Sequence, residues 1–110
     1  MYKIVEVVFP YIEDGSKGKS RPVIVLTKAY GKYKVLVVAY ITTKLDEMLE
    51  TDIVLDANER YFSNTGLLHT SVIRLHKLTS LSLDSVGKEL GEVPATVQKK
   101  IQSSLKTMFF

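Results

Sequence analysis

Five short runs of mainly valine, isoleucine and leucine occupy much of the first 75 residues, with turn-forming or polar segments between them. Such side chains are favoured in strands, where they pack against neighbours on a pleated surface. The runs lie at residues 4–9, 23–26, 34–41, 52–56 and 71–75. So many short strands in 110 residues predict a strongly curved, partly open barrel, because closing a sheet removes exposed edges.

The pattern within the runs indicates how the strands are placed. Residues 23–26 are apolar at every position, which is typical of a central strand, and residues 34–41 follow closely enough to pair with them as a hairpin. In the last run, period-two alternation places Val72, Arg74 and His76 on one face of the sheet. The polar pair Arg74 and His76 can therefore share a site.

The C-terminal part changes from a strand period to a helical one. Apolar residues recur there at steps of four and three, which predicts an amphipathic helix packed on the sheet: Val97, Ile101, Leu105 and Met108. Pro94 suits the first turn of this helix. The spacing of Leu83, Val86 and Leu90 predicts a shorter helical turn beginning near Ser82. We therefore expect one mainly β domain over residues 1–110 with a C-terminal helix.

Composition limits the chemistry that the chain can perform. The absence of cysteine excludes disulfides and thiolate metal sites, and two histidines make a structural zinc site improbable, so no metal or cofactor is expected. A net charge of +3 is compatible with nucleic acid as a partner. The N-terminus lacks the apolar core of a signal peptide and the longest apolar run is too short to span a membrane, which predicts a cytoplasmic protein.

The tripeptide GKS at residues 18–20 matches the end of a phosphate-binding P-loop. That motif needs four residues between its glycines and a helix after GKS. Here only two residues separate Gly15 from Gly18, and Arg21, Pro22 and a β-branched run follow. A nucleotide site is therefore excluded.

The same loop prepares Arg21 for another kind of phosphate contact. Lys17 and Lys19 make the loop basic, and Pro22 restricts Arg21 to an extended backbone at the start of an apolar strand. A guanidinium on a rigid element can hold a phosphate through two hydrogen bonds. The alternative is a solvated hairpin loop with an ordinary surface arginine.

Four segments in order resemble the MazF/PemK family of toxin–antitoxin ribonucleases. They read VVFPYIEDGSKGKSRPVIVL, VLVVAYITTK, TGLLHTSVIRLHKLTSL and LGEVPATVQKKIQSSLKTMF, and together they cover nearly the whole chain. The resemblance implies an SH3-like barrel, a homodimer and the toxin of a type II system that a cognate antitoxin neutralises. It also implies a metal-independent endoribonuclease that cuts single-stranded RNA and leaves a 2′,3′-cyclic phosphate and a 5′-OH end.

The resemblance assigns the catalytic roles to Arg21 and Thr42. RNA carries its own nucleophile, the 2′-OH, so the enzyme has to align that hydroxyl and stabilise charge on the phosphoryl oxygens. Thr42 follows a long apolar strand, and a slip of one residue would select Thr43 instead. The residues expected to contact RNA are Lys17, Lys19, Ser20, Thr43, Lys44, Arg74 and His76.

His76 departs from the family pattern, in which some relatives carry an acidic residue two positions after the arginine that Arg74 matches. The imidazole is left with three roles: a general acid or base, a contact to a base of the RNA, or an inert surface group. The departure also leaves open a non-catalytic SH3-like module that binds RNA or protein. A third alternative is a co-regulator that binds operator DNA only together with its antitoxin.

Overall fold

The computed structural model describes residues 2–9 and 19–110, and for residues 8, 9 and 19 only the backbone. The described chain forms six strands, two 3-10 turns and a helix: β1 (Lys3–Phe9), β2 (Lys19–Val25), β3 (Val35–Thr42), β4 (Ile53–Leu55), η1 (Arg60–Thr65), β5 (Ser71–Ser82), η2 (Leu83–Ser85), β6 (Val86–Glu92) and α1 (Ala95–Phe109).

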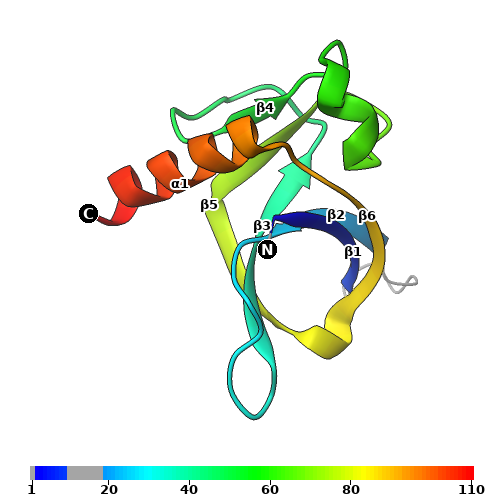
Figure 1. Ribbon diagram of the computed structural model, residues 1–110, viewed down its shortest axis with the longest axis vertical. Helices are drawn as coiled ribbons and strands as arrows, with labels where there is room; N and C mark the ends of the chain where they lie inside the picture. The colour runs from blue at the N-terminus through cyan, green and yellow to red at the C-terminus, as the bar shows by residue number, and fades with distance from the viewer. Residues whose placement is uncertain (1, 10–18) are drawn as a thin grey trace.

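The strands form one antiparallel sheet in the order β4-β5-β3-β2-β1-β6. Figure 1 shows this sheet curling strongly, with β5 and β6 on opposite sides of the curve and α1 lying across the end formed by β4 and β5. The two outer strands, β4 and β6, do not pair with each other, so the curve stays open. The prediction of a mainly β, partly open barrel-like fold with a C-terminal helix is confirmed.

Two apolar clusters occupy the two faces of the curved sheet. The larger contains Ile24, Ala39 and Ile73 from three neighbouring strands, together with Val97 and Ile101 of α1. Leu105 and Met108 pack against the same cluster, so the predicted amphipathic face of the helix is confirmed. The smaller is valine-rich and lies on the other face: Val5, Val7, Val23, Leu36 and Val38. The face with the smaller cluster carries the polar groove described below.

The prediction for the segment after Ser82 is half wrong. A short turn does form, as η2, and the Ser82 hydroxyl oxygen accepts a hydrogen bond from the Asp84 amide at 3.3 Å. The segment Val86–Glu92 is a strand and not a helix, because it pairs along β1 from Lys3 opposite Glu92 to Val7 opposite Val86. Pairing with a distant strand overrides the local helical spacing.

Two strands are longer than predicted. β2 begins at Lys19, before the apolar run, because its polar first residues pair with the end of β1. β5 continues to Ser82, because its second half pairs with β3 beyond an irregularity between Ala39 and Tyr40. That irregularity bends the pair, as bulges do, and contributes to the curvature of the sheet.

No helix among residues 2–9 and 19–110 is both long and apolar enough to cross a bilayer.

Candidate functional site

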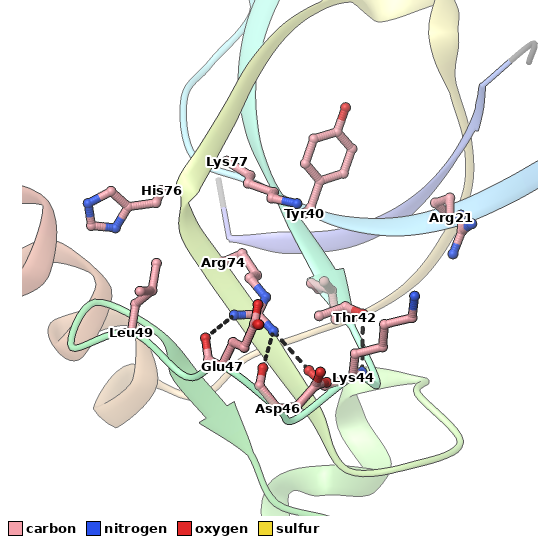
Figure 2. A pocket seen from close by; sticks show the side chains of 11 residues that line it. Arg21, Tyr40, Thr42, Lys44, Asp46, Glu47, Leu49, Arg74, His76 and Lys77 are labelled. Atoms are coloured by element: carbon pink, nitrogen blue, oxygen red, sulfur yellow. Dashed lines mark hydrogen bonds between the residues drawn. The ribbon is translucent and has the colours of Figure 1, made fainter.

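Three adjacent strands direct polar side chains into one open groove of about 730 Å³ (Figure 2). Arg21 comes from β2, Thr42 and Tyr40 from β3, and Arg74 and His76 from β5. Residues 43–52, the loop between β3 and β4, form the other wall. Its lining side chains are Lys44, Asp46, Glu47 and Leu49, and Lys77 of β5 also lines the groove.

The strand register explains why Arg21 and Thr42 face the same groove. Val23 of β2 pairs with Tyr40 of β3 in an antiparallel ladder. Arg21 lies two residues before Val23, and Thr42 lies two residues after Tyr40. Because side chains on a strand alternate with a period of two, both residues point to the face that Val23 and Tyr40 share. The same register leaves Thr43 outside β3, exposed and apart from the groove lining.

Arg21 and Thr42 differ in whether their side chains already bind other parts of the protein. The Arg21 side chain is exposed, and no carboxylate among the described residues lies within ion-pair distance of it. The Thr42 oxygen accepts a hydrogen bond from the Lys44 amide at 3.1 Å. A hydroxyl that accepts can still donate its own proton. The groove therefore contains a guanidinium and a hydroxyl that can both donate to an anion.

Arg74 is bound to the protein itself. Its Nη1 donates to Asp52 Oδ2 at 2.7 Å and to the Glu47 carbonyl at 3.4 Å. Its Nη2 donates to the carbonyls of Lys44 at 3.0 Å and Asp46 at 3.3 Å, and Figure 2 shows these contacts reaching from β5 to the loop. Only 13% of the Arg74 side chain is exposed.

His76 is also tied to the loop. Its Nδ1 is hydrogen-bonded to the Thr51 hydroxyl, although the ring remains exposed on the groove wall. This bond fixes one ring nitrogen and leaves Nε2 for another partner. Tyr40 is half-buried on the groove floor, and its hydroxyl accepts a hydrogen bond from Thr79 at 3.4 Å.

Five of the nine residues singled out in the sequence thus line one groove: Arg21, Thr42, Lys44, Arg74 and His76. Ser20 and Thr43 are exposed but do not line it. Lys17 lies outside the described residues, as does the side chain of Lys19, whose backbone begins β2.

The sequence interpretation missed the loop that closes the groove. Residues 43–52 have no strand or helix period, so nothing marked Asp46, Glu47 or Leu49 as lining residues. One signal was present, because an arginine in the middle of an apolar strand needs a carboxylate when it is buried. Asp52, directly before β4, provides it. Among the described residues, no three His, Asp or Glu side chains are grouped as potential metal ligands.

Residues 1–109 match the model of the PemK-like, MazF-like toxins of type II toxin–antitoxin systems. The chain belongs to this toxin family. This match confirms the resemblance to the MazF/PemK family that the four sequence segments indicate. Among curated proteins, none matches the chain significantly.

Solved structures support the toxin fold. The Mycobacterium tuberculosis toxin MazF-mt6 superposes with a TM-score of 0.72 at 24% identity, covering 97% of this chain and 95% of that one. Another Mtb toxin gives 0.71 at 21%, covering 97% and 100%. An endoribonuclease in complex with its cognate antitoxin, from a mycobacterial species, gives 0.69 at 18%, covering 96% and 89%. At such identities the likeness establishes the fold, and the family match carries the assignment to the toxins.

Proposed function

We propose that this toxin-family protein is a metal-independent endoribonuclease that cleaves single-stranded RNA in the groove between β2, β3 and β5. The observation that carries the proposal is the register that brings Arg21 and Thr42 to one groove, with no carboxylate of the described chain paired to Arg21. The similarity of the fold to a mycobacterial endoribonuclease supports the same activity.

The proposed reaction uses the nucleophile of the substrate. The 2′-OH loses its proton as its oxygen forms a bond to phosphorus, the bond from phosphorus to the 5′ oxygen breaks, and that leaving oxygen takes up a proton, so no proton is gained or lost overall. The products are a 2′,3′-cyclic phosphate and a 5′-OH end. Arg21 stabilises the negative charge on the phosphoryl oxygens, and the Thr42 hydroxyl donates to the same phosphate.

Lys44, Lys77 and His76 of the groove lining are proposed to hold the RNA strand. Lys44 and Lys77 are exposed cations in the lining that can pair with flanking phosphates. His76, fixed through Thr51, presents Nε2 to a base or to a proton in transfer. Lys17, Lys19, Ser20 and Thr43 are proposed to contact the RNA as well.

The proposed partners follow from the family. A toxin of a type II system is neutralised by a cognate antitoxin, and a related fold was solved as an endoribonuclease with its antitoxin. We propose that this protein acts as a homodimer, inhibits growth by cutting mRNA when it is free, and is blocked when an antitoxin covers the groove. Operator DNA is bound only by the toxin–antitoxin complex in this proposal.

Incubation of the purified protein with an RNA of mixed sequence in EDTA tests the activity. We expect discrete cuts whose downstream fragments begin with a 5′-OH, since the proposed chemistry needs no metal ion. RNA that is bound but stays intact would replace the enzyme with a non-catalytic RNA-binding module. Sequencing of the new 5′ ends would also give the cleavage motif.

Thr42→Val tests the hydroxyl while keeping the shape of the side chain. We expect the cleavage rate to fall by about a hundredfold, as is typical when one donor to a developing oxyanion is lost. Thr42→Ser should keep most of the rate. Thr43→Val distinguishes the two registers, because a larger loss at Thr43 than at Thr42 would contradict the assignment. Rates would be measured on a short RNA that contains the mapped cleavage site.

A further inference from the structure

The four terminal N–H groups of Arg74 all point at protein acceptors. Nη1 contacts Asp52 Oδ2 at 2.7 Å and the Glu47 carbonyl at 3.4 Å, and Nη2 contacts the Lys44 and Asp46 carbonyls at 3.0 and 3.3 Å. A guanidinium that holds a phosphate through two hydrogen bonds uses a free pair of parallel N–H groups. An RNA phosphate held through two parallel N–H groups of Arg74 would therefore have to displace Asp52 or a loop carbonyl.

Asp52 depends on Arg74 as much as Arg74 depends on it. The Asp52 side chain is fully buried, and its Oδ2 accepts from Arg74 and also from the Leu49 amide at 2.8 Å. Its Oδ1 is buried with no hydrogen-bond partner in the described part of the chain. A buried carboxylate is tolerated only when an opposite charge compensates it. The pair therefore holds the loop between β3 and β4 from inside.

The loop has a strained backbone at the point where Arg74 holds it. Glu47 has φ of 56°, in the left-handed region that residues other than glycine rarely adopt. Such a conformation persists when the surroundings determine it. The carbonyl of Glu47 is one of the acceptors of Arg74, so Arg74 holds the loop at its strained residue.

Lys44 connects the contacts of Arg74 to Thr42. Arg74 binds the carbonyl of Lys44, and the amide of Lys44 donates to the Thr42 oxygen at 3.1 Å. That amide occupies one side of the Thr42 oxygen, so the Thr42 hydroxyl proton must point elsewhere. The position of Lys44 thus restricts the directions in which Thr42 can donate.

We propose that Arg74 and Asp52 form a buried clamp that holds Lys44 beneath Thr42 and so orients the Thr42 hydroxyl toward the scissile phosphate. Arg74 is then a positioning residue and not a ligand of the RNA, in contrast to the RNA contact expected from the sequence. The inference rests on the proposed function, because the clamp affects cleavage only if Thr42 acts on the phosphate.

Two gentle substitutions test the clamp. Arg74→Lys keeps the charge but has no fork that can reach Asp52 and the carbonyls together. Asp52→Asn keeps the shape and an oxygen for Leu49 but removes the charge. Arg60→Lys is the matched control, because Arg60 is an exposed arginine on η1 that lies outside the groove lining. Circular dichroism first establishes that each variant is folded.

Kinetics on an RNA containing the mapped site give the first measurement. We expect Arg74→Lys and Asp52→Asn each to lower kcat about tenfold, because small displacements of a catalytic group are costly, with a smaller change in KM. In a Thr42→Val background neither substitution should lower kcat further, since the hydroxyl that they misplace is already gone. Arg60→Lys should leave kcat and KM unchanged.

Amide hydrogen exchange gives a second measurement that does not depend on activity. In the unmodified protein, exchange at Lys44 should be at least about tenfold slower than at its exposed neighbour Leu45. Arg74→Lys and Asp52→Asn should remove this protection. An unprotected Lys44 amide in the unmodified protein would contradict the clamp even if both variants failed to fold.

Three results would overturn the clamp. The first is a raised KM with unchanged kcat in Arg74→Lys, which would make Arg74 a ligand of the RNA. The second is additive loss of kcat with Thr42→Val, and the third is an unprotected Lys44 amide in the unmodified protein. A Thr42→Val variant that cleaves normally would refute the proposed role of Thr42, whereas loss of the Lys44 protection in Arg74→Lys and Asp52→Asn would still establish the clamp, so the two failures are distinguishable.

Discussion

Replacement of Arg21 by alanine is expected to remove nearly all RNA cleavage while leaving the fold intact. The guanidinium is the charged donor of the proposed site, and loss of such a donor lowers rates by about 10²–10³-fold. The side chain is exposed and forms no ion pair with the described residues, so the melting temperature should stay within about 2 °C of that of the unmodified protein. Single-turnover cleavage and thermal unfolding would be measured on the same preparation.

Two variants serve as controls for this result. Arg21→Lys keeps the charge but loses the parallel N–H donors of the guanidinium, so its cleavage rate should lie between those of Arg21→Ala and the unmodified protein. Arg60→Ala removes an exposed arginine outside the groove and should cleave normally. If Arg21→Ala kept most of the rate, the phosphate would have to bind elsewhere.

Gly91→Ala is expected to destabilise the fold strongly. A Cβ at position 91 would lie 2.1 Å from the Asn64 carbonyl oxygen and 2.7 Å from that of Thr65, both backbone atoms of η1. Neither atom can move away as a side chain could, so β6 and η1 would have to separate. We expect a loss of about 3 kcal/mol or more in the free energy of unfolding, measured by urea denaturation.

Gly31→Ala provides the comparison. Gly31 has φ of 81°, but a Cβ there would meet no atom within 4 Å. Only the cost of the left-handed backbone remains, about 1 kcal/mol after the stiffer unfolded chain is counted. Equal losses at Gly31 and Gly91 would contradict the close contact between β6 and η1.

Local sequence patterns predicted most of the sheet and the helix. Where the apolar side chains repeat over several turns, as from Val97 to Met108 in α1, the predicted element exists. The strand Val86–Glu92 was missed because it has glycines and charged residues in place of an apolar run. Its place is fixed by pairing with β1, some eighty residues away, and no local pattern reports such a contact.

The candidate site was likewise predictable from the sequence only in part. Arg21 and Thr42 were singled out through the family resemblance, and their shared groove follows from the pairing of adjacent strands. The link between Asp52 and Arg74 depends on how an irregular loop folds back on β5, which a single sequence does not encode in any period. Arg74 was therefore placed correctly on the groove face while its contacts remained hidden.

The claim on which the account depends is that Arg21 and Thr42 act on one phosphate. A crystal structure with an RNA that carries a single 2′-deoxynucleotide at the mapped cleavage site tests it directly, since that RNA cannot be cut. We predict that the phosphate after the deoxynucleotide accepts hydrogen bonds from both the Arg21 guanidinium and the Thr42 hydroxyl. An RNA bound with these two groups on different phosphates, or lying outside the groove, would contradict the account.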